Sequence, residues 1–287
     1  MGGKVRERKW TYRYLAFSLL TLLFTISMAV TAFGGQFEDA DAAYDRGDYA
    51  TTYRLLKPLA EQGNAKAQYN LGFMYSKGQG VPKDDTEAVK WFRKAAEQGN
   101  AFAQVNLGFR YAKGQGVPKD DTEAVKWFRK AAEQGIPKAQ FNLGIMYEKG
   151  QGVLQDYTEA VKWHRRAAAQ GYAKAQYNLG FIYSKGQGVP KDDTEAAKRW
   201  RKAAEQGYAR AQYNLGFMYD KGQGVPKDSV LAHMWFNLAA SRFHASEGGK
   251  RELAVESRNL VASKMTPAQI AEAQRLAREW KPKKEVK

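Results

Sequence analysis

The feature that most constrains this chain is a repeat of fixed length. The stretch "AKAQYNLGFMYSKGQGVPKDDTEAVKWFRKAAEQG" over residues 65–99 returns nearly unchanged from Ala101, and more loosely three more times. The spacing is 36 residues throughout, without insertion or deletion, because a closing glycine stands at Gly63, Gly99, Gly135, Gly171 and Gly207. A period of this length predicts a stack of small supersecondary units in place of one globular core.

Each copy is predicted to be a pair of helices. In the first complete copy, Leu71 and Tyr75 fall on one face of a helix that ends at Gly78, where glycine can adopt the left-handed cap conformation. Pro82 prevents that helix from continuing, and Asp84 stands three residues before a glutamate, which is the spacing of a capping box. A second helix is therefore expected from Asp84 onward, and the chain is predicted to be all-α.

The fixed positions also carry a family resemblance. The pattern A-x-A-Q-x-x-L-G-x-x-Y-x-x-G-x-G-V-x-x-D-x-x-x-A-x-x-W-x-x-x-A, read over residues 65–95, resembles the Sel1-like repeat, a longer relative of the tetratricopeptide repeat. The resemblance covers about residues 39–246 and implies a right-handed α-solenoid. Two copies depart from the pattern: His164 takes the phenylalanine position in the third, and Arg199 replaces the expected tryptophan in the fourth, with Trp200 shifted by one place.

The repeats are expected to be flanked by other segments. A repeat array must cover the open apolar face of its last unit, and residues beyond Gly249 form two amphipathic patterns, Arg251 to Met265 and Pro267 to Trp280, the second opened by a capping box from Thr266. The predicted organisation is a signal peptide or N-terminal membrane anchor over 1–34, a degenerate first hairpin over 37–62, five repeats of 36 residues over 63–246, C-terminal capping helices over 247–280 and a basic tail over 281–287.

The N-terminus predicts export. Five basic residues precede an uncharged run from Tyr14 to Phe37, which is long for a signal peptide and just adequate for one membrane span. Small residues ending at Ala32 or Gly34 offer cleavage sites, so removal is favoured over an uncleaved anchor. In both cases the repeats cross the membrane, because the basic flank stays inside. We expect a periplasmic protein, or one anchored in the inner membrane and facing the periplasm, with secretion as an alternative.

The inventory of reactive side chains argues against an enzyme. The chain has no cysteine, which excludes disulfides, thiol catalysis and thiolate metal sites and suits an oxidising periplasm. Its histidines, His164, His233 and His244, lack metal-ligand spacing and are interpreted as satisfied or surface residues. We predict no catalytic residue, no metal and no cofactor. The resemblance leaves one alternative, a secreted hydrolase of the β-lactamase type, although such Sel1-like proteins are rich in cysteine.

What remains is a surface on the first helix of each hairpin, opposite the packing face. Three rows of residues recur there at the repeat spacing, and together we call them the first-helix surface. They are an asparagine row (Asn70, Asn106, Asn142, Asn178, Asn214), an apolar row (Phe73, Phe109, Ile145, Phe181, Phe217) and a lysine row (Lys77, Lys113, Lys149, Lys185, Lys221). In a right-handed stack they would line the concave side. Alternatively, the aromatic rings pack between neighbouring helices and the amides bond between hairpins.

The first-helix surface has the chemistry of a protein-binding groove. Amides can bond a peptide backbone, rings can hold apolar side chains, and ammonium groups can pair with carboxylates. We therefore predict a non-catalytic, monomeric scaffold of the bacterial envelope that binds a protein or peptide, with an acidic partner favoured, and that attaches to the membrane only if residues 1–34 stay uncleaved.

The formal net charge of +16 supports a second alternative, binding to nucleic acid or an anionic surface. Residues 1–34 contribute five basic and one acidic side chain, so +12 remains without them, spread over all repeats and mixed with glutamate. Export makes a nucleic-acid partner unexpected.

Overall fold

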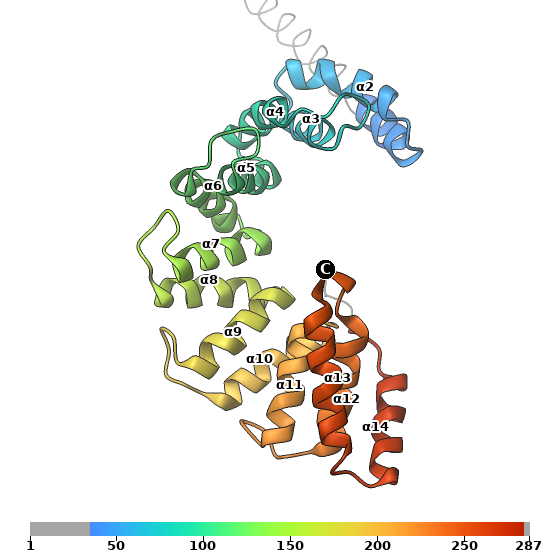
Figure 1. Ribbon diagram of the computed structural model, residues 1–287. Coiled ribbons are helices and arrows are strands. Elements are labelled where there is room, and N and C mark those ends of the chain that lie inside the picture. The colour runs from blue at the N-terminus through green and yellow to red at the C-terminus, as the bar shows by residue number, and fades with distance from the viewer. Residues whose placement is uncertain (1–34, 284–287) are drawn as a thin grey trace, which may run out of the picture. The chain divides into compact units, whose positions relative to one another are not determined.

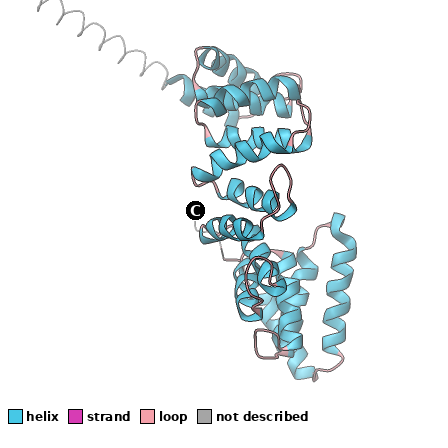
Figure 2. Cartoon of the chain, turned by 90° about the vertical axis from the view of Figure 1, so that its left-hand side faces the viewer, coloured by secondary structure: helices cyan, strands magenta, loops and turns pink. Residues whose placement is uncertain are grey.

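The computed structural model describes residues 35–283, apart from the side chain of Ala245, and these form two compact units, 35–119 and 120–283. Every regular element of these residues is a helix (Figures 1 and 2). The prediction of an all-α chain of helical hairpins is confirmed for the part of the chain that the structure describes.

The first unit begins with a short hairpin. Residues 35–45 are helical and are followed by α2 (Tyr49–Glu61), α3 (Ala65–Lys77), α4 (Asp85–Glu97) and α5 (Ala101–Lys113). Helix α3 has the predicted bounds because its two ends are encoded locally. The Asn64 side chain accepts a hydrogen bond from the backbone N–H of Ala67 at the start, and Gly78 ends the helix with a φ of +69°.

The second unit continues the same pattern and ends in two helices outside the repeat. Its elements are α6 (Asp121–Glu133), α7 (Pro137–Lys149), α8 (Tyr157–Ala169), α9 (Ala173–Lys185), α10 (Asp193–Glu205), α11 (Ala209–Lys221), α12 (Ser229–Arg242), a 3₁₀ turn (Ala245–Glu247), α13 (Gly248–Ala262) and α14 (Pro267–Glu279). Helix α13 lies three residues earlier than predicted, because the 3₁₀ turn leads the chain directly into it.

The aspartate caps act as predicted, but the capping box forms at only one of the two predicted kinds of site. The Asp84 side chain accepts hydrogen bonds from two backbone N–H groups of α4, whereas the side chain of Glu87 pairs with Lys90 and does not reach back. At α14, Thr266 and Gln269 form the reciprocal capping box that the sequence predicts.

Within a hairpin, one glycine of the first helix lies against one ring of the second. A Cβ atom built on Gly72 would lie 2.7 Å from the ring of Phe92, and one on Gly180 would lie 2.4 Å from Trp200. Trp200 therefore fills the slot that phenylalanine fills in other hairpins, which corrects the interpretation of a tryptophan shifted from its own position. Arg199 stands in the tryptophan position and bonds to Glu195.

His164 fills the same slot against Gly144. Its side chain is fully buried, and neither ring nitrogen has a hydrogen-bond partner among the described residues; Nε2 lies 3.5 Å from Oε2 of Glu148. The interpretation of the histidines as satisfied or surface residues is wrong for His164. It is also wrong for His233, which is buried and whose Nδ1 has no hydrogen-bond partner in the described part of the chain, whereas His244 is exposed.

Buried glutamines join successive hairpins. Gln140 donates from Nε2 to the carbonyl of Ala132 at 3.1 Å, and its Oε1 accepts a hydrogen bond from Gln170 at 2.9 Å. The same glutamine pair recurs between Gln68 and Gln98 and between Gln176 and Gln206. These bonds satisfy amides that would be costly to bury alone, so they fix the register between hairpins.

The second glycine of each "GQG" loop lies close against the start of the second helix of the preceding hairpin. Gly116 has a φ of +73°, and a Cβ atom there would lie 2.0 Å from the backbone oxygen of Asp85 at the start of α4. No side chain fits at that position. The first hairpin has no such loop, because its two helices are joined by residues 46–48 alone.

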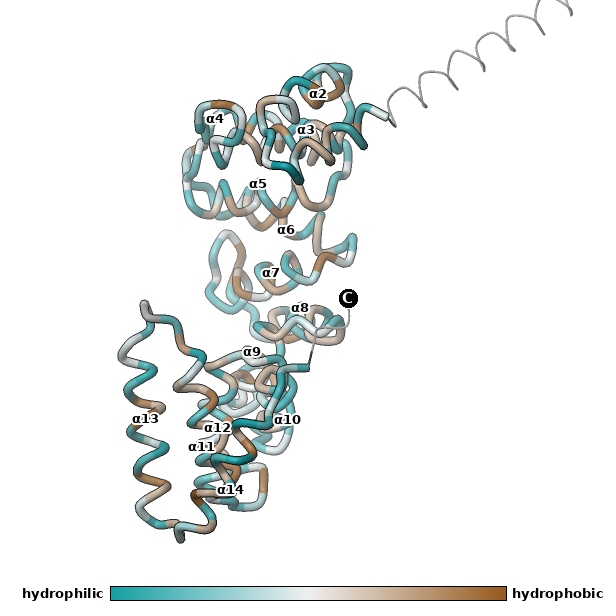
Figure 3. The backbone as a smooth tube through the Cα atoms, turned by 90° about the vertical axis from the view of Figure 1, so that its right-hand side faces the viewer, coloured by the Kyte–Doolittle hydropathy of each residue, from teal (hydrophilic) through white to brown (hydrophobic). Residues whose placement is uncertain are grey.

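Helices α13 and α14 both pack against α12 (Figure 1). The rings of Trp235 and Trp280 meet edge to face with centroids 6.2 Å apart, and the guanidinium of Arg242 lies 4.3 Å from the centroid of the Trp280 ring. Hydrophilic and hydrophobic residues alternate along the helices (Figure 3), as expected of elements that bury one face.

The predicted targeting segment, residues 1–34, lies outside the described residues, as does most of the basic tail. Among residues 35–283, no helix has the length and apolar character that a membrane crossing requires.

Candidate protein-binding surface

The lysine and aromatic rows of the first-helix surface are accessible. All five lysines of the row are exposed, and the rings of Phe181 and Phe217 are 39% and 43% exposed. Lysine and ring also contact each other within a helix: Lys185 Nζ lies 5.9 Å from the centroid of Phe181, and Lys221 Nζ lies 5.6 Å from that of Phe217. Each pair offers an apolar face beside a positive charge.

The structure brings four of the predicted residues together in one pocket of the second unit. Phe181 and Lys185 come from α9, and Asn214 and Phe217 come from α11; they line a hollow of about 330 Å³. The sequence analysis did not single out the other lining residues, which are Ser184, Lys191, Asp193, Trp200, Tyr213, Met218 and Gln223.

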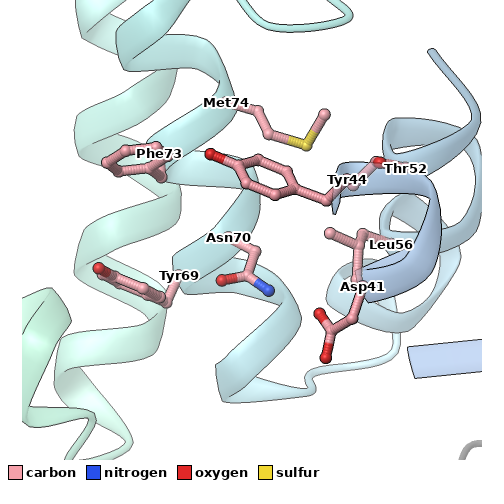
Figure 4. A pocket seen from close by; sticks show the side chains of 8 residues that line it. All are labelled: Asp41, Tyr44, Thr52, Leu56, Tyr69, Asn70, Phe73 and Met74. Carbon is pink, nitrogen blue, oxygen red and sulfur yellow. The ribbon is translucent and has the colours of Figure 1, made fainter. Parts of the chain in front are cut away.

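A pocket in the first unit uses the same repeat positions. Tyr69, Asn70, Phe73 and Met74 of α3 line a hollow of about 280 Å³ and occupy the positions of Tyr213, Asn214, Phe217 and Met218 four repeats later. The rest of its lining comes from the first hairpin: Asp41, Tyr44, Thr52 and Leu56. Figure 4 shows Tyr44 and Asp41 on the side facing α3. The tyrosine that precedes Asn70, and that recurs before Asn178 and Asn214, was the sequence signal for this pocket.

The asparagine row is half-buried and lies partly at the seams between hairpins. The side chain of Asn106 donates to the backbone oxygen of Phe102 at 2.9 Å, and although burial raises the pKa of Tyr69, Asn106 lies close enough to that tyrosine to oppose part of the rise. Asn214 lies beside Tyr177 in the same way, and burial raises the pKa of Tyr177 in spite of it. For these two residues the structure places the amide between neighbouring first helices, which is the alternative that the sequence left open.

The remaining predicted residues are not among those that line the pocket between α9 and α11. Asn142 donates to its own helix at Lys138, Phe73, Phe109 and Ile145 are half-buried, and Lys113 and Lys149 are exposed. The ammonium group of Lys77 lies 5.7 Å from the centroid of the Phe73 ring, a contact of the same kind as those of Phe181 and Phe217 with their lysines.

A third hollow of about 230 Å³ lies beside the 330 Å³ pocket and shares Tyr213 and Asn214 with it. Arg210 and Lys250 also line this hollow, and both pair with Glu247, at 2.7 and 2.9 Å. These hydrogen bonds, from Lys250 first and then from Arg210, lower the pKa of Glu247 to about 2. The carboxylate of Glu247 therefore already lies between two cationic side chains that line this hollow.

No group of three or more histidine, cysteine, aspartate or glutamate side chains within residues 35–283 is placed to hold a metal ion. The arrangement can bury apolar side chains, pair with charges and bond amides.

Comparison with known proteins identifies the family. A model of the Sel1 repeat matches residues 65–100, 101–136, 137–172, 173–208 and 209–242, which together make up more than half of the chain. The chain belongs to the Sel1 repeat family. The resemblance stated from the sequence is confirmed, and each matched repeat starts at the first helix of one hairpin.

Relatives of this Sel1 repeat protein include both solved structures and a curated protein. The crystal structure of c5321, a protective antigen present in uropathogenic Escherichia coli strains, superposes with a TM-score of 0.77 at 40% identity, covering 86% of this chain and 53% of that one. A Sel1 repeat protein from Oxalobacter formigenes gives a TM-score of 0.69 at 39% identity, covering 72% of this chain and 86% of that one.

The curated relative is the secretory immunoglobulin A-binding protein EsiB of Escherichia coli O6:H1 (strain CFT073). It is 52% identical over 40 residues, which are 14% of this chain and 8% of EsiB. The chain thus spans about half the length of the antigen and matches a small part of EsiB.

Proposed function

We propose that this Sel1 repeat protein is a non-catalytic scaffold of the bacterial envelope that binds a partner protein on its first-helix surface. The observation that carries the proposal is the pocket between α9 and α11, where Phe181 and Phe217 expose their rings beside lysine side chains. A soluble surface rarely keeps large aromatic rings in contact with water at one place unless they meet a partner. The name of EsiB, which states immunoglobulin A binding, supports protein binding in this family.

The chemistry of this pocket favours an acidic, partly apolar peptide segment. Lys185 and Lys191 bring two positive charges to the lining, and Asp193, which pairs with Lys191 at 3.5 Å, brings one negative charge. An apolar side chain on the Phe217 ring would be buried, while a neighbouring carboxylate would pair with Lys185. Exposed charges of this kind mainly raise the rate of association and add selectivity, and the aromatic contacts contribute most of the affinity.

The test uses site-specific photo-crosslinking followed by measured affinity. A photoreactive residue at position 217 of the full chain, expressed in its own envelope, should capture a partner, and the same residue at Leu154 should not. Leu154 is 90% exposed in a loop away from the pocket lining, so it is a matched exposed apolar control.

The partner is then purified and its affinity measured. Phe181→Ala with Phe217→Ala should weaken binding by about tenfold or more, because the exposed rings would be buried only in the complex. The melting temperature should change little, since neither ring is in the core. Unchanged affinity in the double variant contradicts the proposal.

Export is part of the same proposal. Fusion of residues 1–40 to a reporter that is active only outside the cytoplasm should give activity. Mass spectrometry of the mature N-terminus distinguishes the two forms: a start near Phe33 or Gly35 indicates a cleaved protein, and an intact Met1 or Gly2 indicates an anchor. An inactive reporter argues against an envelope location.

A further inference from the structure

We infer that the pocket between the first hairpin and α3 binds a basic side chain, a lysine or arginine of a partner protein, whereas its counterpart between α9 and α11 accepts acidic groups. The pocket uses part of the proposed binding surface, so the source of the basic side chain rests on the proposed function. The chemical preference of the pocket does not.

The two pockets share one wall and differ in the other. Tyr69, Asn70 and Phe73 repeat as Tyr213, Asn214 and Phe217, so the α3 and α11 walls present the same groups. Opposite α11, helix α9 contributes Lys185. Opposite α3, the helical residues 35–45 contribute Tyr44 and Asp41, and Asp41 is the single charged residue that lines this pocket. The first hairpin therefore brings a negative charge to this pocket at the place where α9 brings a positive charge to its counterpart.

The lining suits a long cationic side chain. Three aromatic residues, Tyr44, Tyr69 and Phe73, contribute to it, and Figure 4 shows Tyr44 projecting from the first hairpin toward Phe73. Aromatic faces attract ammonium and guanidinium groups. Thr52 and Leu56 are each 2% exposed and form part of a floor against which the methylene stem of lysine or arginine can pack.

Lysine ammonium groups already contact aromatic rings in this part of the molecule. Lys77 Nζ lies 5.7 Å from the centroid of Phe73, and Lys66 Nζ lies 4.8 Å from that of Phe37. Lys66 also pairs with Asp41 at 3.5 Å, with both side chains 59% exposed. Exposed pairs of this kind contribute little, so an incoming cation can replace Lys66 at Asp41.

The charged residues around the pocket also favour a cationic ligand. Residues 35–48 carry five acidic side chains and one basic side chain, in a protein whose formal net charge is +16. This short stretch is an acidic exception on a basic chain, and the four acidic residues Glu38, Asp39, Asp41 and Asp45 belong to the helical residues that form the pocket wall. Such a field favours a cation over an anion at this end of the first unit.

The experiment is a titration of the isotope-labelled full chain followed by NMR. The probes are N-acetyl-lysine N-methylamide, its neutral isostere in which a methyl group replaces the ammonium (the N-acetyl N-methylamide of 2-aminoheptanoic acid), and tetramethylammonium. The lysine compound should shift the signals of Tyr44, Tyr69 and Asn70, with a dissociation constant at least about fivefold below that of the neutral isostere, since the charge carries the preference. Equal binding of the two isosteres, or no shift at these residues, overturns the inference.

Variants locate the charge. Asp41→Asn and Phe73→Leu should each weaken binding of the lysine compound by about threefold or more, and Lys66→Ala should tighten it by about twofold because Asp41 loses its resident partner. Asp45→Asn removes an acid from the same helical residues without touching the lining, and Phe217→Leu alters the counterpart pocket; both should leave binding unchanged. Circular dichroism checks that each variant is folded.

Two outcomes reassign the pocket. Tighter binding of tetramethylammonium than of the lysine compound assigns it to a small quaternary ammonium ligand and overturns the partner lysine. If Asp45→Asn weakens binding as much as Asp41→Asn, the effect is a general acidic field, and the pocket itself is not the site. The proposed function is tested separately, because the model compounds bind or fail to bind whether or not the chain captures a protein.

Discussion

Replacing His164 by phenylalanine is expected to stabilise the second unit. The imidazole is fully buried against Gly144, and neither nitrogen has a hydrogen-bond partner among the described residues. In two other hairpins the same slot holds Phe92 and Phe236, which are 1% and 2% exposed. A Cβ atom on Gly72 would lie 2.7 Å from Phe92, and one on Gly144 would lie 2.6 Å from His164, so the slot accepts a phenyl ring with similar clearance.

The magnitude follows from the unpaired polar atoms. Burying a polar group without a partner costs about 1–3 kcal/mol, and phenylalanine removes two such nitrogens. The gain is reduced by Glu148, whose Oε2 is buried, lies 3.5 Å from the imidazole and has no hydrogen-bond partner among residues 35–283. Ser76 and Ser184 occupy the position of Glu148 in the first and fourth repeats. His164→Phe with Glu148→Ser should therefore raise the unfolding free energy by about 1–3 kcal/mol, and His164→Phe alone by less.

The assay is urea and thermal unfolding followed by circular dichroism at neutral pH, with both single variants and the double variant. For a domain of this size, about 1 kcal/mol shifts the melting temperature by about 2–4 °C. The reasoning is refuted if each single variant loses about 3 kcal/mol or more, because that loss is the signature of breaking a buried ion pair. A double variant less stable than the natural chain refutes it as well.

Three further outcomes are expected. Gly116→Ala should lower the unfolding free energy by about 1–3 kcal/mol, because its Cβ atom meets a backbone oxygen at a positive φ, and Gly99→Ala, in open space at a similar φ, should cost less when both are measured by urea unfolding. Burial, with a smaller contribution from Arg258, lowers the pKa of His233 from its ordinary value of 6.5, so the unfolded chain binds a proton more readily than the folded one. Stability should therefore fall as the pH drops through about 6.5. The melting temperatures of His233→Gln at pH 7.5 and 5.5 should differ less than those of the natural chain. Asn106→Ala should cost about 1 kcal/mol by removing an amide that bonds to Phe102 and lies beside the tyrosine of α3, and an unchanged melting temperature would contradict a role at the seam.

Much of the local structure could be predicted from the sequence because short-range physics decides it. The bounds of α3 follow from Asn64, Gly78 and the helical spacing between them, and the capping box at Thr266 needs residues no further than three positions away. The period of 36 residues predicted the hairpin as the unit, and the pattern of fixed residues within it carried the resemblance to the Sel1 repeat that the family model confirms. The start of α13 was missed because a 3₁₀ turn, with no strong composition signal, leads into it.

The functional residues were predicted only in part. The repeat spacing selected Phe181, Lys185 and Phe217, which the structure gathers in one pocket, because repetition in the sequence places equivalent side chains on equivalent faces. It could not distinguish an amide in a groove from an amide at a seam, since both fall on the same face of the helix. That depended on whether a tyrosine of the preceding helix lies within bonding distance, as Tyr69 does for Asn106.

Tertiary structure alone decided what departs from the repeat. Trp200 fills the phenylalanine slot, His164 is buried with no hydrogen-bond partner among residues 35–283, and Asp41 faces a pocket whose opposite wall comes from a later helix. Each outcome depends on atoms that are distant in sequence, because burial and the charge of a pocket are set by the walls that close around a side chain. The sequence by itself determined the helical hairpin and its repetition. Packing within and between neighbouring hairpins determined which positions depart from the repeat and what chemistry results there.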